Sequence, residues 1–167
     1  MATLLIDSNV WSHLVLGDAK KQAKIKADLA LLLQKYPMAT QAISEISKAE
    51  CWVAARRLAD SSERAKCEAS FMQIFSSSQL VTIPVSAAVL NNAASLRGDL
   101  LRLAARAGAP PASADGGKLK LIDAIIAASC LEFDVPAVLV TENDKDFRYL
   151  ETGVAKTIAG LTVERIG

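Results

Sequence analysis

Short apolar runs alternate with longer helix-like segments along the whole 167-residue chain. Five of these runs have the length of buried strands and are bounded by polar or turn-forming residues. They are Thr3–Ile6, Met38–Ile43, Leu80–Val85, Ala137–Thr141 and Leu161–Ile166. Strands that alternate with helices form a mainly parallel sheet whose two faces are both covered by helices. The sequence therefore predicts an α/β fold with three layers and a central five-stranded sheet.

The segments between the runs are predicted to be helical. They are about Ser12–Lys35, Ser47–Phe75, Ser86–Ala107 with Ser86 as its N-cap, Ile122–Glu132, and a short helix around Lys145–Leu150. The stretch Gly108–Gly117 is the one clear loop. Because no internal repeat or interdomain linker is visible, we expect a single domain over residues 1–167.

Composition limits the classes of protein to consider. Hydrophobic residues make up 51% and charged residues only 22%, which favours a well-buried core and an apolar surface suited to a partner. A net charge of +1 gives no overall attraction for nucleic acid, so a polyanion would be held locally. The three cysteines lack the spacing of a disulfide framework or a zinc site. With no signal peptide and no apolar run of about 18 residues, the expected location is cytoplasmic.

Acidic and amide side chains stand at the boundaries of four apolar segments. Asp7 follows the first strand, Glu50 comes shortly after the second, Asp123 opens a helix, and Asn143 follows the strand that ends at Thr141. Ligands of parallel sheets bind beyond the carboxyl ends of the strands, so we expect these groups to converge there. A dense group of carboxylates persists only if cations bind it, and oxygen ligands suit Mg²⁺. The pattern predicts a metal-dependent enzyme.

Each acidic residue also has a purely structural interpretation. Asp7 and Asp123 would cap the helices that follow them, and Asp146 would stabilise the first turn of its helix. Glu50 would be an exposed helix carboxylate. Capping does not require an acid at all four boundaries, so the set as a whole favours a site.

Aromatic and basic residues near the acids leave two interpretations open. Trp11 and Trp52 would either stack on a substrate base or fill the core, and the core is the better prediction. A basic helical surface would either contact phosphates or form a solvated face paired with neighbouring acids. That surface consists of Arg56, Arg57, Arg64 and Lys66.

Four motifs carry the acidic residues in order along the chain. They are Ile6-Asp7-Ser8-Asn9, Ser44-Glu45-Ile46-Ser47-Lys48-Ala49-Glu50, Asp123-Ala124-Ile125-Ile126-Ala127-Ala128, and Thr141-Glu142-Asn143-Asp144-Lys145-Asp146-Phe147. In this order the motifs resemble those of the PIN-domain ribonucleases, most closely the VapC-type toxins of toxin–antitoxin pairs. The resemblance covers nearly the whole chain, and it implies a PIN-like three-layer α/β/α sandwich.

The resemblance also implies the roles of individual residues. Asp7, Glu50 and Asp123 would be the metal-binding carboxylates, and either Asn143 or the catalytic Asp146 would complete the site. The register of the second motif selects Glu50 rather than Glu45. Hydrogen bonds from supporting residues would orient these ligands. The supporting residues are Ser8, Asn9 and Thr141.

The activity implied by the resemblance is that of a Mg²⁺- or Mn²⁺-dependent endoribonuclease, the toxin of a type II toxin–antitoxin pair. Its substrate would be RNA such as transfer or ribosomal RNA. Its protein partner would be a cognate antitoxin packed on the helices after the first and second strands, and the toxin itself would be a homodimer.

Two other functions remain open from the residues. An Asp-nucleophile phosphatase would use Asp7, but such enzymes want a second Asp at the position of Asn9. A non-catalytic PIN-like module that binds RNA or protein would have no reason to retain three carboxylates.

Overall fold

The computed structural model describes residues 2–106, 120–131, 133, 137–151, 154–157 and 161–167. Its central sheet has five strands in the order β3-β2-β1-β4-β7, and every neighbouring pair is parallel. The strands are β1 (Thr3–Ile6), β2 (Thr40–Ser44), β3 (Leu80–Ile83), β4 (Ala137–Thr141) and β7 (Thr162–Arg165). The predicted five-stranded parallel sheet is confirmed, and the strand that carries Asp7 at its end is the central one.

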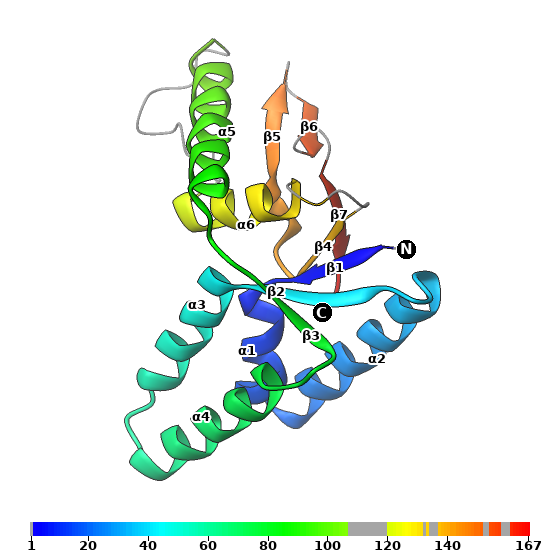
Figure 1. The fold of residues 1–167 in the computed structure, drawn as a ribbon, viewed down its shortest axis with the longest axis vertical. Helices are drawn as coiled ribbons and strands as arrows, with labels where there is room; N and C mark the ends of the chain where they lie inside the picture. Colours follow the sequence, from blue (N-terminus) through cyan, green and yellow to red (C-terminus); the bar gives the residue numbers. More distant parts are fainter. Residues whose placement is uncertain (1, 107–119, 132, 134–136, 152–153, 158–160) are drawn as a thin grey trace.

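Helices cover both faces of this sheet (Figure 1). One face carries α1 (Ser8–Leu16), α2 (Ala19–Lys35), α3 (Glu45–Arg56) and α4 (Ser61–Phe75), and the other carries α5 (Ala87–Arg106) and α6 (Leu121–Leu131). The predicted N-cap of α5 is confirmed, because the Ser86 hydroxyl accepts the Val89 N–H at 3.0 Å. The molecule therefore has the three layers expected of an α/β/α sandwich.

Alternate residues of each central strand enter two different cores. In β1, Leu5 packs with α5 and α6, whereas Leu4 and Ile6 pack with the helices α1 to α4. In β4, Leu139 lies on the first side and Val140 on the second. A strand buried on both faces consists of a continuous apolar run, which is why these strands could be located in the sequence.

The prediction of one continuous helix over Ser12–Lys35 is wrong. The structure has two helices, α1 and α2, separated at Gly17 and Asp18. Asp18 begins α2, where its carboxylate accepts the Lys21 N–H at 2.8 Å. A side chain that bonds to the backbone in this way favours a helix start over a helix interior.

The predicted helix over Ser47–Phe75 is divided for the same reason. It is α3 and α4 in the structure, and Asp60 begins α4 by accepting the Glu63 N–H at 2.7 Å. Helix α3 also begins earlier than predicted, at Glu45, because Ser44 is its N-cap and accepts the Ser47 N–H at 3.1 Å.

The short helix predicted around Lys145–Leu150 is only partly right. A single 3₁₀ turn, η2, spans Asp144–Phe147, and the chain then forms an antiparallel pair of strands, β5 (Arg148–Glu151) and β6 (Val154–Thr157). These two strands form a small separate sheet that the sequence did not predict. The predicted loop Gly108–Gly117 lies outside the described residues.

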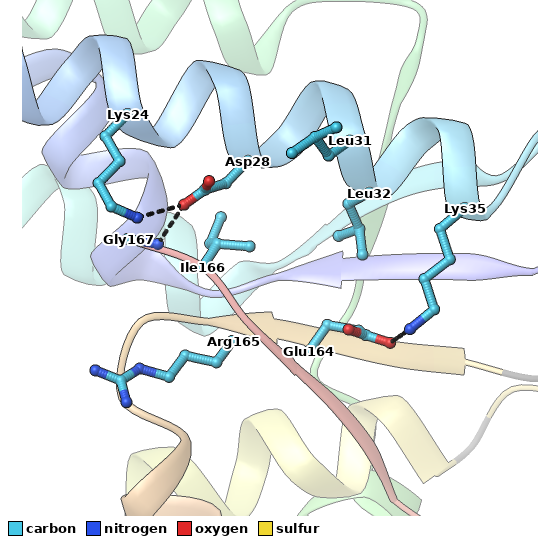
Figure 2. Close-up of a pocket in the computed structure, with 9 residues that line it drawn as sticks. All are labelled: Lys24, Asp28, Leu31, Leu32, Lys35, Glu164, Arg165, Ile166 and Gly167. Atoms are coloured by element: carbon cyan, nitrogen blue, oxygen red, sulfur yellow. Dashed lines mark hydrogen bonds and ion pairs between the residues drawn. The ribbon is translucent and has the colours of Figure 1, made fainter.

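Helix α2 is tied to the last strand by charged groups (Figure 2). Lys35 pairs with Glu164 at 2.5 Å, and Asp28 accepts both the Lys24 ammonium and the Gly167 N–H at 2.9 Å. The contacts to Glu164 and Gly167 hold α2 against β7 and the residues that follow it. Across the part of the chain that the structure describes, no helix has the length and apolarity needed to cross a membrane.

Candidate functional site

Asp7 lies at the carboxyl end of the central strand and is only 5% exposed. Its backbone N–H donates to Val140 O at 2.9 Å, so the end of β1 is held against β4. Asp7 is also the N-cap of α1, where one carboxylate oxygen accepts the Ser8 N–H at 2.7 Å. The structural role proposed for Asp7 is therefore real, and it leaves the carboxylate at the sheet edge where a site is expected.

Ser8 links Asp7 to Glu50. The Ser8 hydroxyl donates to Glu50 Oε2 at 2.7 Å and lies 3.3 Å from Asp7 Oδ1. A hydroxyl carries one proton, so the shorter contact favours Glu50. The carboxylates of Asp7 and Glu50, which are far apart in the sequence, thus meet at one hydroxyl. Glu45 lies elsewhere, since its carboxylate accepts the Val85 N–H ahead of α5 at 3.0 Å.

Thr141, the last residue of β4, holds the second oxygen of Asp7. Its hydroxyl donates to Asp7 Oδ2 at 2.8 Å, and it accepts from Asn9 Nδ2 and from the Asn143 N–H, each at 3.1 Å. The one donor and both lone pairs of this buried hydroxyl are therefore used. Asn9 also accepts the Glu142 N–H at 3.3 Å. Asp7 is fixed in place by both flanking segments.

Burial raises the pKa of Asp7 from 3.8 to about 6. The hydrogen bonds from Thr141 and Ser8 lower this pKa, while the negative charge of Glu50 raises it. A carboxyl group with such a pKa ionises close to neutral pH. A bound cation would favour the charged form and relieve the cost of burying it.

A second cluster of charged groups is centred on Glu142, next to this network. Glu142, which follows Thr141, pairs with His13 Nδ1 of α1 and with Lys21 Nζ of α2 at 2.6 Å. Glu142 lies within the fourth motif but had no predicted role. Its contacts tie α1 and α2 to the end of β4, the strand end that orients Asp7.

The structure brings the remaining predicted ligands less close together. Asp123 is half-buried in the first turn of α6, and its carboxylate accepts the Lys120 N–H at 3.2 Å, a helix-capping contact. Asn143 is exposed, and the side chain of Asp146 lies outside the described residues. Among the side chains that are described, no three His, Cys, Asp or Glu residues are close enough to share one metal ion.

The donor set nevertheless fits a hard divalent cation. Asp7 and Glu50 offer oxygen atoms at the same hydroxyl, and the raised pKa of Asp7 marks a carboxylate whose charge lacks compensation. Mg²⁺ and Mn²⁺ prefer carboxylate, amide and water oxygens. All three described cysteines are free and buried, and burial raises the pKa of Cys51 and of Cys130 to about 12, so they would not act as thiolate ligands.

A pocket of about 390 Å³ opens beside Glu50, between α3 and the start of α6. Its wall is apolar, with one acidic and one basic side chain among the lining residues. They are Ile46, Ala49, Glu50, Val53, Ala54, Arg57 and Ile122. The pocket therefore borders Glu50, one of the predicted metal-binding carboxylates.

The structure resolves the two open interpretations of the aromatic residues in favour of the core. Trp11 is 6% exposed, and its indole N–H donates to Ile6 O at 3.2 Å. Trp52 packs edge-on against Phe71 and Phe75, with ring centroids 6.0 and 6.1 Å apart. These rings therefore join α1, α3 and α4, with Trp11 buried and Trp52 half-buried.

Another hollow, of about 430 Å³, lies between α2 and the C-terminal residues (Figure 2). Its two acidic residues are engaged by neighbours: Asp28 by Lys24 and the Gly167 N–H, and Glu164 by Lys35 and the Tyr36 hydroxyl. It is thus a less suitable cation site than the sheet edge at Asp7.

Comparison with known proteins agrees with this geometry. A family model described as PIN domain matches residues 4–152, which include all four motifs. The chain matches none of the curated protein sequences.

Solved structures of similar fold come from toxin–antitoxin systems. The DNA-bound VapBC from Salmonella typhimurium has a TM-score of 0.65 at 16% identity, with 99% of this chain and 98% of that chain covered. VapBC2 from Rickettsia felis, bound to a DNA fragment of its promoter, has a TM-score of 0.61 at 22% identity and covers 100% of both chains. VapC20 from Mycobacterium tuberculosis, a toxin that cleaves the sarcin-ricin loop, has a TM-score of 0.50 at 14% identity, covering 81% and 86%. At these identities the likeness establishes the fold.

Proposed function

The chain belongs to the PIN domain family, and we propose that it is a Mg²⁺- or Mn²⁺-dependent endoribonuclease, the toxin of a type II toxin–antitoxin pair. One observation carries the proposal: the Ser8 hydroxyl joins the Asp7 and Glu50 carboxylates at the carboxyl end of the central strand. The three free and buried cysteines agree with the expected cytoplasmic location.

In this proposal Asp7, Glu50 and Asp123 hold the metal, and Asn143 or Asp146 completes the set. When bound, the divalent ion supplies neutralising charge for the phosphate oxygens and lowers the pKa of a water molecule. The protein's own contribution is orientation. Thr141 and the Ser8 N–H hold the two oxygens of Asp7, and the Ser8 hydroxyl holds Glu50. Asp7, with its pKa of about 6, gives up its proton near neutral pH to become a ligand.

The direct test is cleavage of purified transfer and ribosomal RNA in Mg²⁺, in Mn²⁺ and in EDTA. We expect endonucleolytic products that require the ion and that disappear with Asp7→Asn. Cleavage that persists in EDTA, or in the Asp7→Asn variant, would contradict the proposal.

We further propose that a cognate antitoxin packs on α3 and α4. Similar solved structures are described as complexes of toxin with antitoxin. Between α3 and α4 lies a groove of about 560 Å³ whose lining includes Trp52, Val53 and Met72. Val53 is 49% exposed and Met72 is 61% exposed. Exposed apolar side chains that share one groove are typical of a surface that binds a partner protein. Met72→Glu should prevent the antitoxin from copurifying while RNA cleavage by the isolated chain is kept.

The other candidate functions have less support. Asn9, at the position where a phosphatase wants a second Asp, is engaged with Thr141 and the Glu142 N–H. A homodimer stays a prediction, and light scattering of the purified chain would test it.

A further inference from the structure

The basic surface of α3 and α4 does not behave as one unit. Arg56 lines the groove between α3 and α4, with its Nε 3.9 Å from Glu68 Oε1. Arg64 donates to the Leu58 carbonyl at 2.9 Å. Arg57 instead lines the pocket beside Glu50, and it belongs to none of the ion pairs found among the described residues. One exposed arginine therefore lines the same pocket as Glu50 of the candidate site.

Helix geometry explains why Arg57 and Glu50 share this pocket. Residues seven apart lie on the same helix face, separated by roughly 10 Å along the axis. Val53 stands between them on that face and also lines the pocket. The pocket thus has the Glu50 carboxylate at one end and the Arg57 guanidinium at the other, with an apolar wall between them.

A position near a helix C-terminus is favourable for any cation, so the macrodipole alone accounts for an arginine at the end of α3. It does not distinguish Arg57 from Arg56, which lies in the same last turn. What distinguishes them is the pocket that each one lines. Arg56 is therefore a matched control for every effect of charge and helix end.

We propose that this pocket receives a nucleotide that flanks the scissile bond of the RNA strand, and that Arg57 binds its phosphate. The inference rests on the proposed ribonuclease function. The planar guanidinium presents several donors in a fork that matches phosphate oxygens. The apolar wall of Ile46, Val53 and Ile122 suits the face of a base. With a net charge of only +1, a local contact of this kind has to supply the attraction for a polyanion.

The test measures binding and cleavage separately. Binding uses a fluorescein-labelled, random-sequence, single-stranded RNA of 12 nucleotides and fluorescence anisotropy in Mg²⁺. The protein carries Asp7→Asn so that the RNA stays intact, and Arg57→Ala, Arg57→Lys and Arg56→Ala are compared in that background. We expect Arg57→Ala to raise Kd about tenfold and to reduce the slope of log K against log salt by about 0.7, the value for one phosphate contact to a single strand. Arg57→Lys should keep the slope and lose part of the affinity, and Arg56→Ala should stay within about twofold of the parent.

Three results would overturn the inference: no RNA binding by the parent, equal effects of Arg56→Ala and Arg57→Ala, or an Arg57→Ala variant that binds RNA normally but loses a copurifying antitoxin. The last result would assign the pocket to a protein. Cleavage by the chain that retains Asp7 is scored independently. Binding that depends on Arg57 without any cleavage would refute the ribonuclease proposal and leave the phosphate subsite in place. Cleavage that does not depend on Arg57 would refute the phosphate subsite and leave the ribonuclease proposal in place.

Discussion

Thr141 is the residue on which the geometry of the candidate site most depends, through its hydroxyl group. It donates to Asp7 and accepts from Asn9 and from the Asn143 N–H, so three segments meet at one oxygen atom. Thr141 was predicted to be a supporting residue because of the motif in which it occurs. The hydrogen bonds themselves could not be predicted, because the partners lie 132 and 134 residues apart in the chain.

Two substitutions of Thr141 distinguish the effect of its volume from the effect of its hydrogen bonds. Thr141→Val keeps the volume but removes the donor to Asp7 Oδ2 and the acceptor for Asn9 Nδ2. We expect a loss of about 2 kcal/mol in the free energy of unfolding and a strong loss of RNA cleavage. Thr141→Ser keeps the hydroxyl and should retain most of both. Urea titration and the cleavage assay check this pair, and equal stability of the Val and Ser variants would contradict it.

The raised pKa of Asp7 makes stability depend on pH. The folded chain holds the Asp7 proton up to a pKa of about 6, whereas the unfolded chain releases it near 3.8. Ionisation therefore costs stability as the pH rises from about 4 to about 6, by roughly 2–3 kcal/mol in total. In EDTA, the stability of Asp7→Asn relative to the parent chain should rise by this amount between pH 4 and pH 7. Denaturant titrations at several pH values would measure it, and a difference that does not vary with pH would refute the burial argument.

At the scale of elements, apolar periodicity located the strands well and the helix boundaries poorly. The strands β1 and β4 begin and end where the sequence predicted, because each is a short apolar run buried on both faces. The breaks at Asp18 and Asp60 were missed because the chain is helical on both sides of each, and the capping hydrogen bond that separates the two helices is local. The hairpin of β5 and β6 was missed because neither strand has the apolar pattern of a buried one.

The break between α1 and α2 can be tested at its cap. Asp18→Ala removes the acceptor for the Lys21 N–H and should lower the free energy of unfolding by about 1 kcal/mol. Asp18→Asn should change it little, since Asn caps about as well as Asp. Thermal unfolding of the three proteins measures both effects. An Ala variant as stable as the parent would mean that packing alone determines where α2 begins.

The start of α3 decides which glutamate faces Asp7. With Ser44 as N-cap, Glu45 stands in the first turn and bonds to the Val85 N–H, whereas Glu50 lies one turn later beside Ser8. Glu50→Gln should therefore reduce cleavage by about a hundredfold or more. Glu45→Gln should leave the rate nearly unchanged and instead weaken the connection to α5. Rates measured side by side in Mg²⁺ would test this order, and the opposite ranking would refute the proposed site.

At the scale of the molecule, the candidate ligands belong to segments that meet only in the folded chain: β1, α3, α6 and the turn after β4. An ion bound by the folded chain alone raises its stability according to concentration, by about 2.7 kcal/mol at a hundred times Kd. We therefore expect Mn²⁺ to raise the melting temperature of the parent chain at pH 7. The rise should be absent in Asp7→Asn and smaller in Asp146→Asn. A melting temperature that Mn²⁺ raises equally in all three would show that the ion binds elsewhere.

The position of β1 in the centre of the sheet also determines when the site comes into existence. Asp7 is made more than 130 residues before its neighbours Val140 and Thr141. Until β4 emerges, β1 has one neighbouring strand instead of two, and the Asp7 carboxylate lacks the hydroxyl that orients it. Under the proposed ribonuclease function, the chain would therefore gain its activity only after β4 has been made and has paired with β1. Helices α3 and α4, the proposed antitoxin surface, precede β4 in the chain, so this surface would be made before the proposed site is complete.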